Sequence, residues 1–176
     1  MVSSEFGPNG ISTKPLNGIF AGKDILTIEQ LDQKSFDRLN SQVELLEELL
    51  QGYRRSTLLR HVIVVSAVDS MAIGNYQGTV RKRFPFEAAV SRLGGKILNQ
   101  ELPSPEDPMF DYKILDIKAS LPDAVLISHP NQELVQRAAN VFQGTIGKIP
   151  IINTSIFEDP KVETCGALVA LTLGKI

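Results

Sequence analysis

Short apolar stretches rich in β-branched residues alternate with amphipathic stretches along this chain, and this alternation most constrains the fold. The stretch HVIVVS at His61–Ser66 predicts a strand buried on both faces. Further short strands are expected at Lys96–Leu98, Ala124–Ile127 and Ile149–Ile152. Strands that alternate with helices favour a parallel sheet with right-handed crossovers. We therefore predict a single α/β domain, a three-layer α/β/α fold with about four parallel strands.

Apolar residues recur at three- and four-residue steps from Lys34 to Tyr53, which predicts a long amphipathic helix. Ahead of it, Thr27 and Gln30 have the spacing of a capping box. The other expected helices are one with Pro85 in its first turn and Gly94-Gly95 at its end, one marked by Phe110, Ile114, Ile117 and Leu121, Glu133–Phe142, and Val162–Leu173.

Composition excludes several classes of function. A net charge of −2 argues against a general nucleic-acid binder, which needs a broad basic face. Cys165 is the only cysteine and there are two histidines, so we expect no disulfide within the chain, no metal site and no cofactor. The longest apolar runs are too short to span a bilayer.

The first residues combine Ser, Gly, Pro and Asn without a hydrophobic period, so residues 1–22 are expected to form a flexible arm ahead of a domain at 23–176. The arm lacks the apolar core of a secretory signal. Its Glu5 and low positive charge weaken an organelle-targeting role without removing that alternative. We expect an intracellular protein, most simply a cytoplasmic one.

Arg81, Lys82 and Arg83 stand at the expected start of the helix that contains Pro85. The unpaired amides and the dipole of a helix N-terminus already favour anions, and three cations strengthen that preference. This cluster is therefore a candidate phosphate-type site. The alternative is a solvated, positively charged helix start without a ligand.

His129 is expected just after a parallel strand, at the strand end where α/β proteins bind ligands. The alternative is a histidine that caps a neighbouring backbone group. Cys165 lies among small and apolar residues, which favours buried packing over a reactive thiol.

Four segments resemble the carbamoyl-phosphate-binding half of the aspartate and ornithine carbamoyltransferases, closer to the aspartate kind. They are GKDILTIEQLDQKSFDRL, RFPFEAAVSRLGGKIL, DAVLISHPNQELVQRAA and IPIINT. The resemblance covers roughly Phe20 to Thr154. It implies the fold of that half, and we expect the family's second domain, which binds the amino-acid substrate, to be missing.

In that family a Ser-Thr-Arg-Thr-Arg motif precedes a Phe-Glu helix and grips carbamoyl phosphate. Aligned on Phe86 and Glu87, its positions are here occupied by Thr79, Val80, Arg81, Lys82 and Arg83. The resemblance thus implies a reduced anion site of Thr79, Arg81, Lys82, Arg83 and His129. Arg81 can offer a planar fork to a phosphate and Thr79 one hydrogen bond, whereas Val80 offers no donor.

Other family positions are altered. Lys113 is the only lysine near the loop that supplies a serine and a lysine to the neighbouring subunit, and Ser128 stands where an arginine is expected. The family's His-Pro-Thr-Gln motif falls near Asp159 and Pro160, and an anionic Asp159 would repel a developing oxyanion. The last helix resembles both the family's first interdomain helix and its C-terminal helix.

We therefore predict a degenerate aspartate carbamoyltransferase-like domain that does not catalyse alone and acts as a structural or regulatory subunit. The resemblance implies a homo-oligomer, with a trimer favoured, or a complex with a complete carbamoyltransferase or another protein. One alternative is an active or partner-complemented transferase that joins carbamoyl phosphate to aspartate in pyrimidine synthesis. Another is a sensor of a small phosphate-type anion, which would use Thr79, Arg81 and Lys82.

Overall fold

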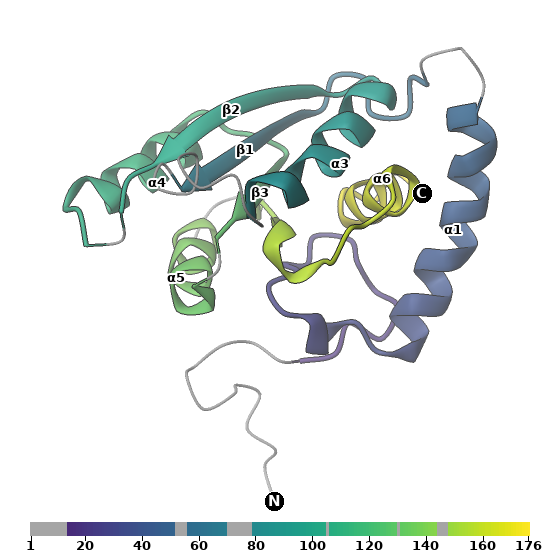
Figure 1. Cartoon of the computed structure of the whole chain (residues 1–176), viewed down its shortest axis with the longest axis horizontal. Coiled ribbons are helices and arrows are strands. Elements are labelled where there is room, and N and C mark those ends of the chain that lie inside the picture. Colours follow the sequence, from purple (N-terminus) through teal and green to yellow (C-terminus); the bar gives the residue numbers. More distant parts are fainter. Residues whose placement is uncertain (1–13, 52–55, 70–78, 105, 130, 144–147) are drawn as a thin grey trace, which may run out of the picture.

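The computed structural model describes residues 14–51, 56–69, 79–104, 106–129, 131–143 and 148–176. Within them one sheet of four parallel strands has the order β2-β1-β3-β4. The strands are β1 (Ile63–Asp69), β2 (Lys96–Leu102), β3 (Ala124–Ser128) and β4 (Ile151–Asn153). The helices are α1 (Gln33–Gln51), α3 (Thr79–Arg92), α4 (Met109–Ala119), α5 (Gln132–Phe142), α6 (Val162–Thr172) and the 3-10 turns η1 (Ile28–Gln30) and η2 (Thr154–Ile156), as Figure 1 shows. The predicted α/β fold is confirmed.

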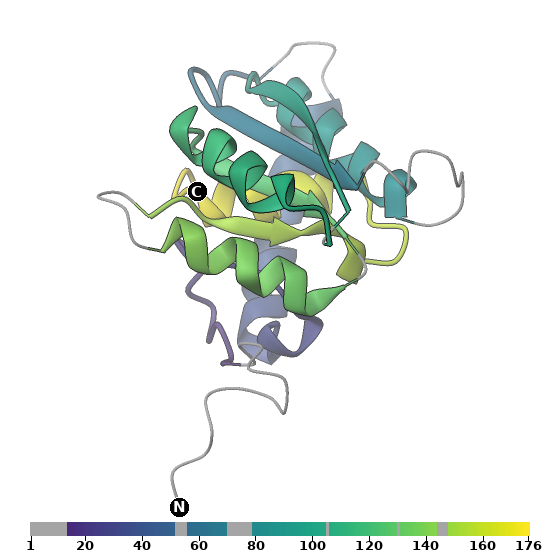
Figure 2. The ribbon, with the colours of Figure 1, turned by 90° about the vertical axis from the view of Figure 1, so that its left-hand side faces the viewer.

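Helices cover both faces of the sheet (Figure 2). On one face, Val65 and Ala67 of β1 belong to an apolar cluster with buried residues of α4 and α5. On the other, Val64 belongs to a cluster with residues of α3, α6 and α1. Successive residues of a strand point to opposite faces, so the consecutive apolar residues of β1 supply both clusters. The strand is buried on both faces, as the sequence predicts.

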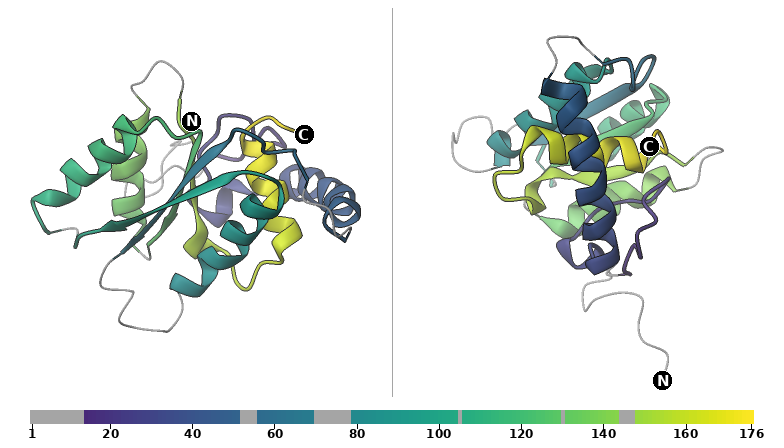
Figure 3. Two further views of the ribbon diagram at one scale, coloured as in Figure 1. Left: turned by 90° about the horizontal axis from the view of Figure 1, so that it is seen from above. Right: turned by 90° about the vertical axis from the view of Figure 1, so that its right-hand side faces the viewer.

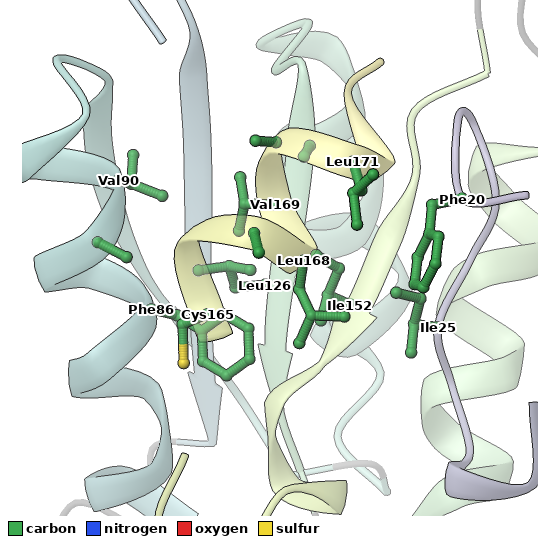
Figure 4. Packing of buried hydrophobic residues seen from close by; sticks show 14 of the residues in the cluster. Phe20, Ile25, Phe86, Val90, Leu126, Ile152, Cys165, Leu168, Val169 and Leu171 are labelled. Carbon is green, nitrogen blue, oxygen red and sulfur yellow. The ribbon is translucent and has the colours of Figure 1, made fainter. Parts of the chain in front are cut away.

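Helix α6 is the centre of the larger cluster. Its eight residues from Cys165 to Thr172 are all buried, which is the pattern of a helix surrounded by protein. Figure 3 shows α1 crossing the outer side of α6, and Figure 4 shows Leu168 of α6 beside Ile152 of β4. Gly166 lets α6 lie close to α3, because a Cβ at this position would lie 3.2 Å from Leu93 Cδ1 and 3.5 Å from Ala89 Cβ.

The packed part of the chain begins before residue 22, the predicted end of the flexible arm. Leu16 and Phe20, which the sequence assigned to a flexible arm, are 7% and 2% exposed and join the larger cluster. Their segment is held because Ile25 forms a parallel bridge with Ile152 at the free side of β4. Residues 1–13 of the predicted arm lie outside the described residues.

Several element boundaries differ from the sequence predictions. Strand β1 begins at Ile63, because His61 has a φ of +69°. Strand β2 runs on to Leu102, four residues beyond its predicted end. Leu121 is 74% exposed with a φ of +50°, so it follows α4 and does not belong to the buried face of that helix. None of the helices in the described part of the chain has the length and apolar character needed to span a bilayer.

Candidate functional site

Three parts of the chain meet at one edge of the sheet: the first half of α3, the end of β3 and the turn after β4. The strands are parallel, so their carboxyl ends lie together, and open α/β sheets bind ligands beyond such ends. His129 directly follows β3, and Ser155 lies in η2 after β4. This edge is therefore the candidate site.

Helix α3 begins at Thr79, so Pro85 lies in its interior and the predicted position of Pro85 in the first turn is wrong. Proline has no N–H, so the carbonyl of Arg81 receives no i+4 hydrogen bond from it. The basic residues therefore occupy the first turns of α3 themselves. The side chains of Thr79 and Arg81, two predicted ligands, lie outside the described residues.

The ammonium group of Lys82 is directed at the protein's own backbone. Its Nζ donates a hydrogen bond of 2.9 Å to the carbonyl oxygen of Ser155, and the contact is partly buried. Ser155 is itself held in place: its Oγ lies 2.8 Å from the carbonyl oxygen of His129 and 2.6 Å from Oδ1 of Asn153. Lys82 thereby ties α3 to the ends of β3 and β4.

Arg83 faces a carboxylate one helical turn further along α3. Its Nε lies 3.5 Å from Oε1 of Glu87, and both side chains are 18% exposed. The distance makes this an ion pair, and Nε has no hydrogen bond within the described residues. The same Glu87 oxygen accepts a 2.6 Å hydrogen bond from Oγ of Ser66, a buried residue of β1. The guanidinium also lies 5.4 Å from the ring centroid of Phe84.

His129 is buried, with 5% of its surface exposed. Its Nδ1 accepts a 3.0 Å hydrogen bond from the backbone N–H of Asn131, the residue that caps α5. An Nδ1 that accepts a hydrogen bond carries no proton, so the imidazole in this contact is neutral. His129 thus accepts from the backbone of the residue that caps α5, which is the kind of contact that its structural alternative predicts.

The structure brings Lys82 and His129 to the same turn, through Ser155, and places Arg83 on the Ser66–Glu87 pair beside them. Sequence reasoning missed Ser66, Glu87, Asn153 and Ser155. The i, i+4 spacing of Arg83 and Glu87 was a readable signal for their pairing. Nothing local signals the contact of Lys82, because Ser155 lies 73 residues away along the chain.

The remaining predicted positions add no ligand group to this edge. Ser128, at the end of β3, is 2% exposed. Asp159 is exposed, with a φ of +39°. Cys165 is buried in α6, and desolvation raises the pKa of its thiol. Among the described residues no group of three or more His, Cys, Asp or Glu side chains is placed to hold a metal ion.

No family model matches the sequence. Two curated relatives are named as aspartate carbamoyltransferase catalytic subunits. The protein from Methanosarcina barkeri is 25% identical over 137 residues, 76% of this chain and 41% of the relative. The protein from Methanosarcina acetivorans is 25% identical over 138 residues, 77% of this chain and 41% of the relative. The chain therefore spans about two fifths of the length of these relatives.

Solved structures have the same fold. Aspartate transcarbamoylase from Trypanosoma cruzi in complex with phosphate superposes with a TM-score of 0.62 at 22% identity, over 79% of this chain and 40% of that chain. The catalytic subunit of aspartate transcarbamoylase from M. jannaschii gives a TM-score of 0.57 at 20% identity, over 79% and 42%. In sequence and fold, the chain is thus a low-identity, partial-length homologue of aspartate carbamoyltransferases.

Proposed function

We propose that this chain is a carbamoyltransferase-like domain that does not catalyse transcarbamoylation alone and acts as a structural or regulatory subunit. The observation that carries the proposal is that two cations of the basic cluster contact groups of the protein itself. Lys82 donates to the Ser155 carbonyl, and Arg83 pairs with Glu87. A phosphate group would have to share these cations with the protein's own groups, which reduces what they can offer to a ligand.

The chemistry of the reaction supports the same conclusion. Transfer of a carbamoyl group requires a neutralised phosphate, a polarised carbonyl and an amine positioned for attack. His129, a predicted anion ligand, uses Nδ1 to accept from the Asn131 amide, so this nitrogen offers no donor to a carbonyl oxygen. Asp159 is an acid, and its negative charge opposes an oxyanion.

The partner we propose is another subunit of this protein or a complete carbamoyltransferase, with a homotrimer as the favoured assembly. The curated relatives are named as catalytic subunits, which is a reason to expect that related chains act in assemblies. We propose a cytoplasmic location, because a chain with one cysteine forms no disulfide within itself and fits a reducing compartment.

A product assay tests the catalytic half of this proposal. The purified chain is incubated with carbamoyl phosphate and aspartate, and carbamoyl-aspartate is measured beside a complete aspartate carbamoyltransferase as positive control. We expect no product from the chain alone. Product that disappears in an Arg81→Ala variant would overturn the proposal and support the active transferase.

Light scattering after size-exclusion chromatography tests the other half. We expect a mass above the 19.3 kDa of one chain, with a trimer favoured. A monomer at all concentrations, with or without an added complete carbamoyltransferase, would contradict a role through subunit contacts.

The anion sensor stays the second candidate, because a structural neighbour is a complex with phosphate. Thr79, Arg81 and Lys82 would be its ligands. A ligand at a hundred times its dissociation constant stabilises a protein by about 2.7 kcal/mol, which is a measurable rise in melting temperature. No rise with millimolar carbamoyl phosphate or inorganic phosphate would rule out the sensor.

A further inference from the structure

A hollow in the described part of the chain lies away from the candidate site, beside the amino end of β4. It is a cavity of about 320 Å³ between the segment at 14–30 and α5. Lys148, which lines it, precedes β4 by three residues, whereas Ser155 follows that strand. The cavity is therefore separate from the candidate site at the carboxyl ends of the strands.

The wall that precedes α1 is fixed by backbone contacts. Ile25 donates to the carbonyl of Ile151 and accepts from the amide of Asn153, both at 2.8 Å. Leu16 donates to the carbonyl of Gln30 at 2.9 Å. Figure 4 shows the segment of Phe20 and Ile25 beside the strand that carries Ile152. A wall held in this way needs little ordering when a ligand binds.

The lining carries an excess of positive charge. Lys14, Lys23 and Lys148 line the cavity against a single acid, Asp24, which leaves two positive charges in excess. The Asp24 carboxylate is already engaged, because Oδ1 accepts from the Ile151 amide at 3.0 Å and Oδ2 lies 3.4 Å from Lys148 Nζ. Lys23 makes no ion pair with any described residue.

One side of the cavity is apolar. Leu16 and Leu26 are buried beneath it, and Ile19 lies at its rim with 59% of its surface exposed. Gln136 and Gln143 of the α5 side add amide groups. A cavity of this size with an apolar wall and a few polar groups has the features of a small-molecule site.

We propose that this cavity binds a small organic dianion, a compact molecule with an apolar body and one phosphate-type or dicarboxylate group. The body rests on Leu16 and Leu26, and the dianion lies among the lysines, led by Lys23. Lysine binds such groups as a point charge. This inference stands apart from the proposed function, whatever the product assay gives.

Phenyl phosphate is a suitable probe, because it joins an apolar ring to a group that is dianionic at pH 8, above a second pKa of about 6. Amide chemical shifts of the full chain are followed by NMR during a titration to about 10 mM, which detects dissociation constants near 1 mM. We expect the shifts to concentrate at Leu16, Leu26 and Gln136, and the affinity to fall as salt is added.

Lys23→Gln should weaken phenyl phosphate binding about tenfold, because a charged contact is lost. Lys161→Gln, which removes another exposed lysine outside this lining, is the matched control and should leave the affinity unchanged. Phenol and inorganic phosphate, which each lack half of the probe, should bind more weakly at these amides.

Three results would overturn the proposal. The first is an absence of shifts in the wild-type chain. The second is shifts confined to α3, His129 and Ser155, which would place the anion at the other site. The third is equal affinity of the Lys23→Gln variant for phenyl phosphate, or equal affinity of the wild-type chain for phenol. Either result would mean that the charge of the dianion does not contribute to binding.

Discussion

Lys82 shows how one side chain can look like a ligand group and serve the fold. A cation in the first turns of a helix is unfavourable to the helix dipole. The carbonyl of Ser155 offsets that cost by accepting its hydrogen bond, and Ser155 is fixed by Asn153 and His129. The charge is thus directed inward, between three elements.

Replacing Lys82 should therefore reduce stability. We expect Lys82→Met to lower the free energy of unfolding by about 1–2 kcal/mol, because the Ser155 carbonyl loses a charged donor. Urea denaturation followed by circular dichroism measures the change. Lys161→Met, at an exposed residue, should stay within about 0.5 kcal/mol of the wild type. Equal stability of the two variants would mean that the Lys82 contact contributes nothing.

Asp32 gives a prediction on pH. Its Oδ1 accepts from Ser35 Oγ at 2.6 Å and from Ser35 N at 3.0 Å ahead of α1, and the hydroxyl contact in particular lowers the pKa of the carboxyl. The folded state therefore holds the charged form more strongly than the unfolded chain does. Its contribution to stability is complete above the unfolded pKa and is lost as pH falls through the lowered folded pKa.

Ser35→Ala should move the pKa of Asp32 upward, toward its ordinary value, as measured by NMR titration of the carboxyl carbon. Ser41→Ala is the control, because the Ser41 hydroxyl donates to a carbonyl of its own helix and its loss should leave the Asp32 pKa in place. An unchanged pKa in the Ser35 variant would show that the hydroxyl is not its cause.

At the scale of elements, the end of α3 depends on a glycine with no room for a side chain. Gly94 has a φ of +88°, and a Cβ there would lie 2.7 Å from the carbonyl oxygen of Ser56. Gly22 also has a positive φ, +68°, but a Cβ added there would meet no atom within 4 Å. A side chain at Gly22 would therefore cause backbone strain alone, whereas a side chain at Gly94 would cause strain and a steric clash.

Gly22→Ala should cost about 1–2 kcal/mol, the strain of a left-handed residue alone. Gly94→Ala should cost more, by at least about 1 kcal/mol, because the Ser56 segment must shift as well. Thermal or urea unfolding of both variants gives the comparison. Equal losses in the free energy of unfolding would mean that the backbone around Ser56 shifts without cost.

The elements also show where sequence reasoning succeeds. β-Branched runs and helical periods located β1, α1, α5 and α6, because each depends on its own apolar pattern. The start of α3 was misplaced, since Pro85 is a common first-turn residue and here lies in the interior. The candidate site was only half predictable: the cations are visible in the sequence, but their partners Ser66 and Ser155 come from distant parts of the chain.

At the scale of the whole molecule, one sheet joins two apolar clusters, and α6 fills the larger one. The clusters share β1 and β3, so strands that lose their packing on one face also support the packing of the other. We infer that the described domain unfolds as one cooperative unit.

Leu168→Ala should lower the free energy of unfolding by about 2–5 kcal/mol, because it leaves a cavity in the centre of the larger cluster. Amides of α4 and α5, on the opposite face, should lose their NMR signals at the same urea concentration as those of α3. Leu173→Ala, at the half-buried end of the helix, is the milder control. Separate transitions for the two faces would refute a single unit.

The burial of Cys165 has a kinetic consequence. A thiol with no exposed surface and a raised pKa cannot meet an alkylating reagent until α6 leaves its place. Since the chain has one cysteine, the rate of its modification counts only those openings. Labelling with iodoacetamide should be slow in buffer and should accelerate with urea in parallel with global unfolding. The labelling rate of Cys165 therefore reports how often the larger apolar cluster opens to solvent.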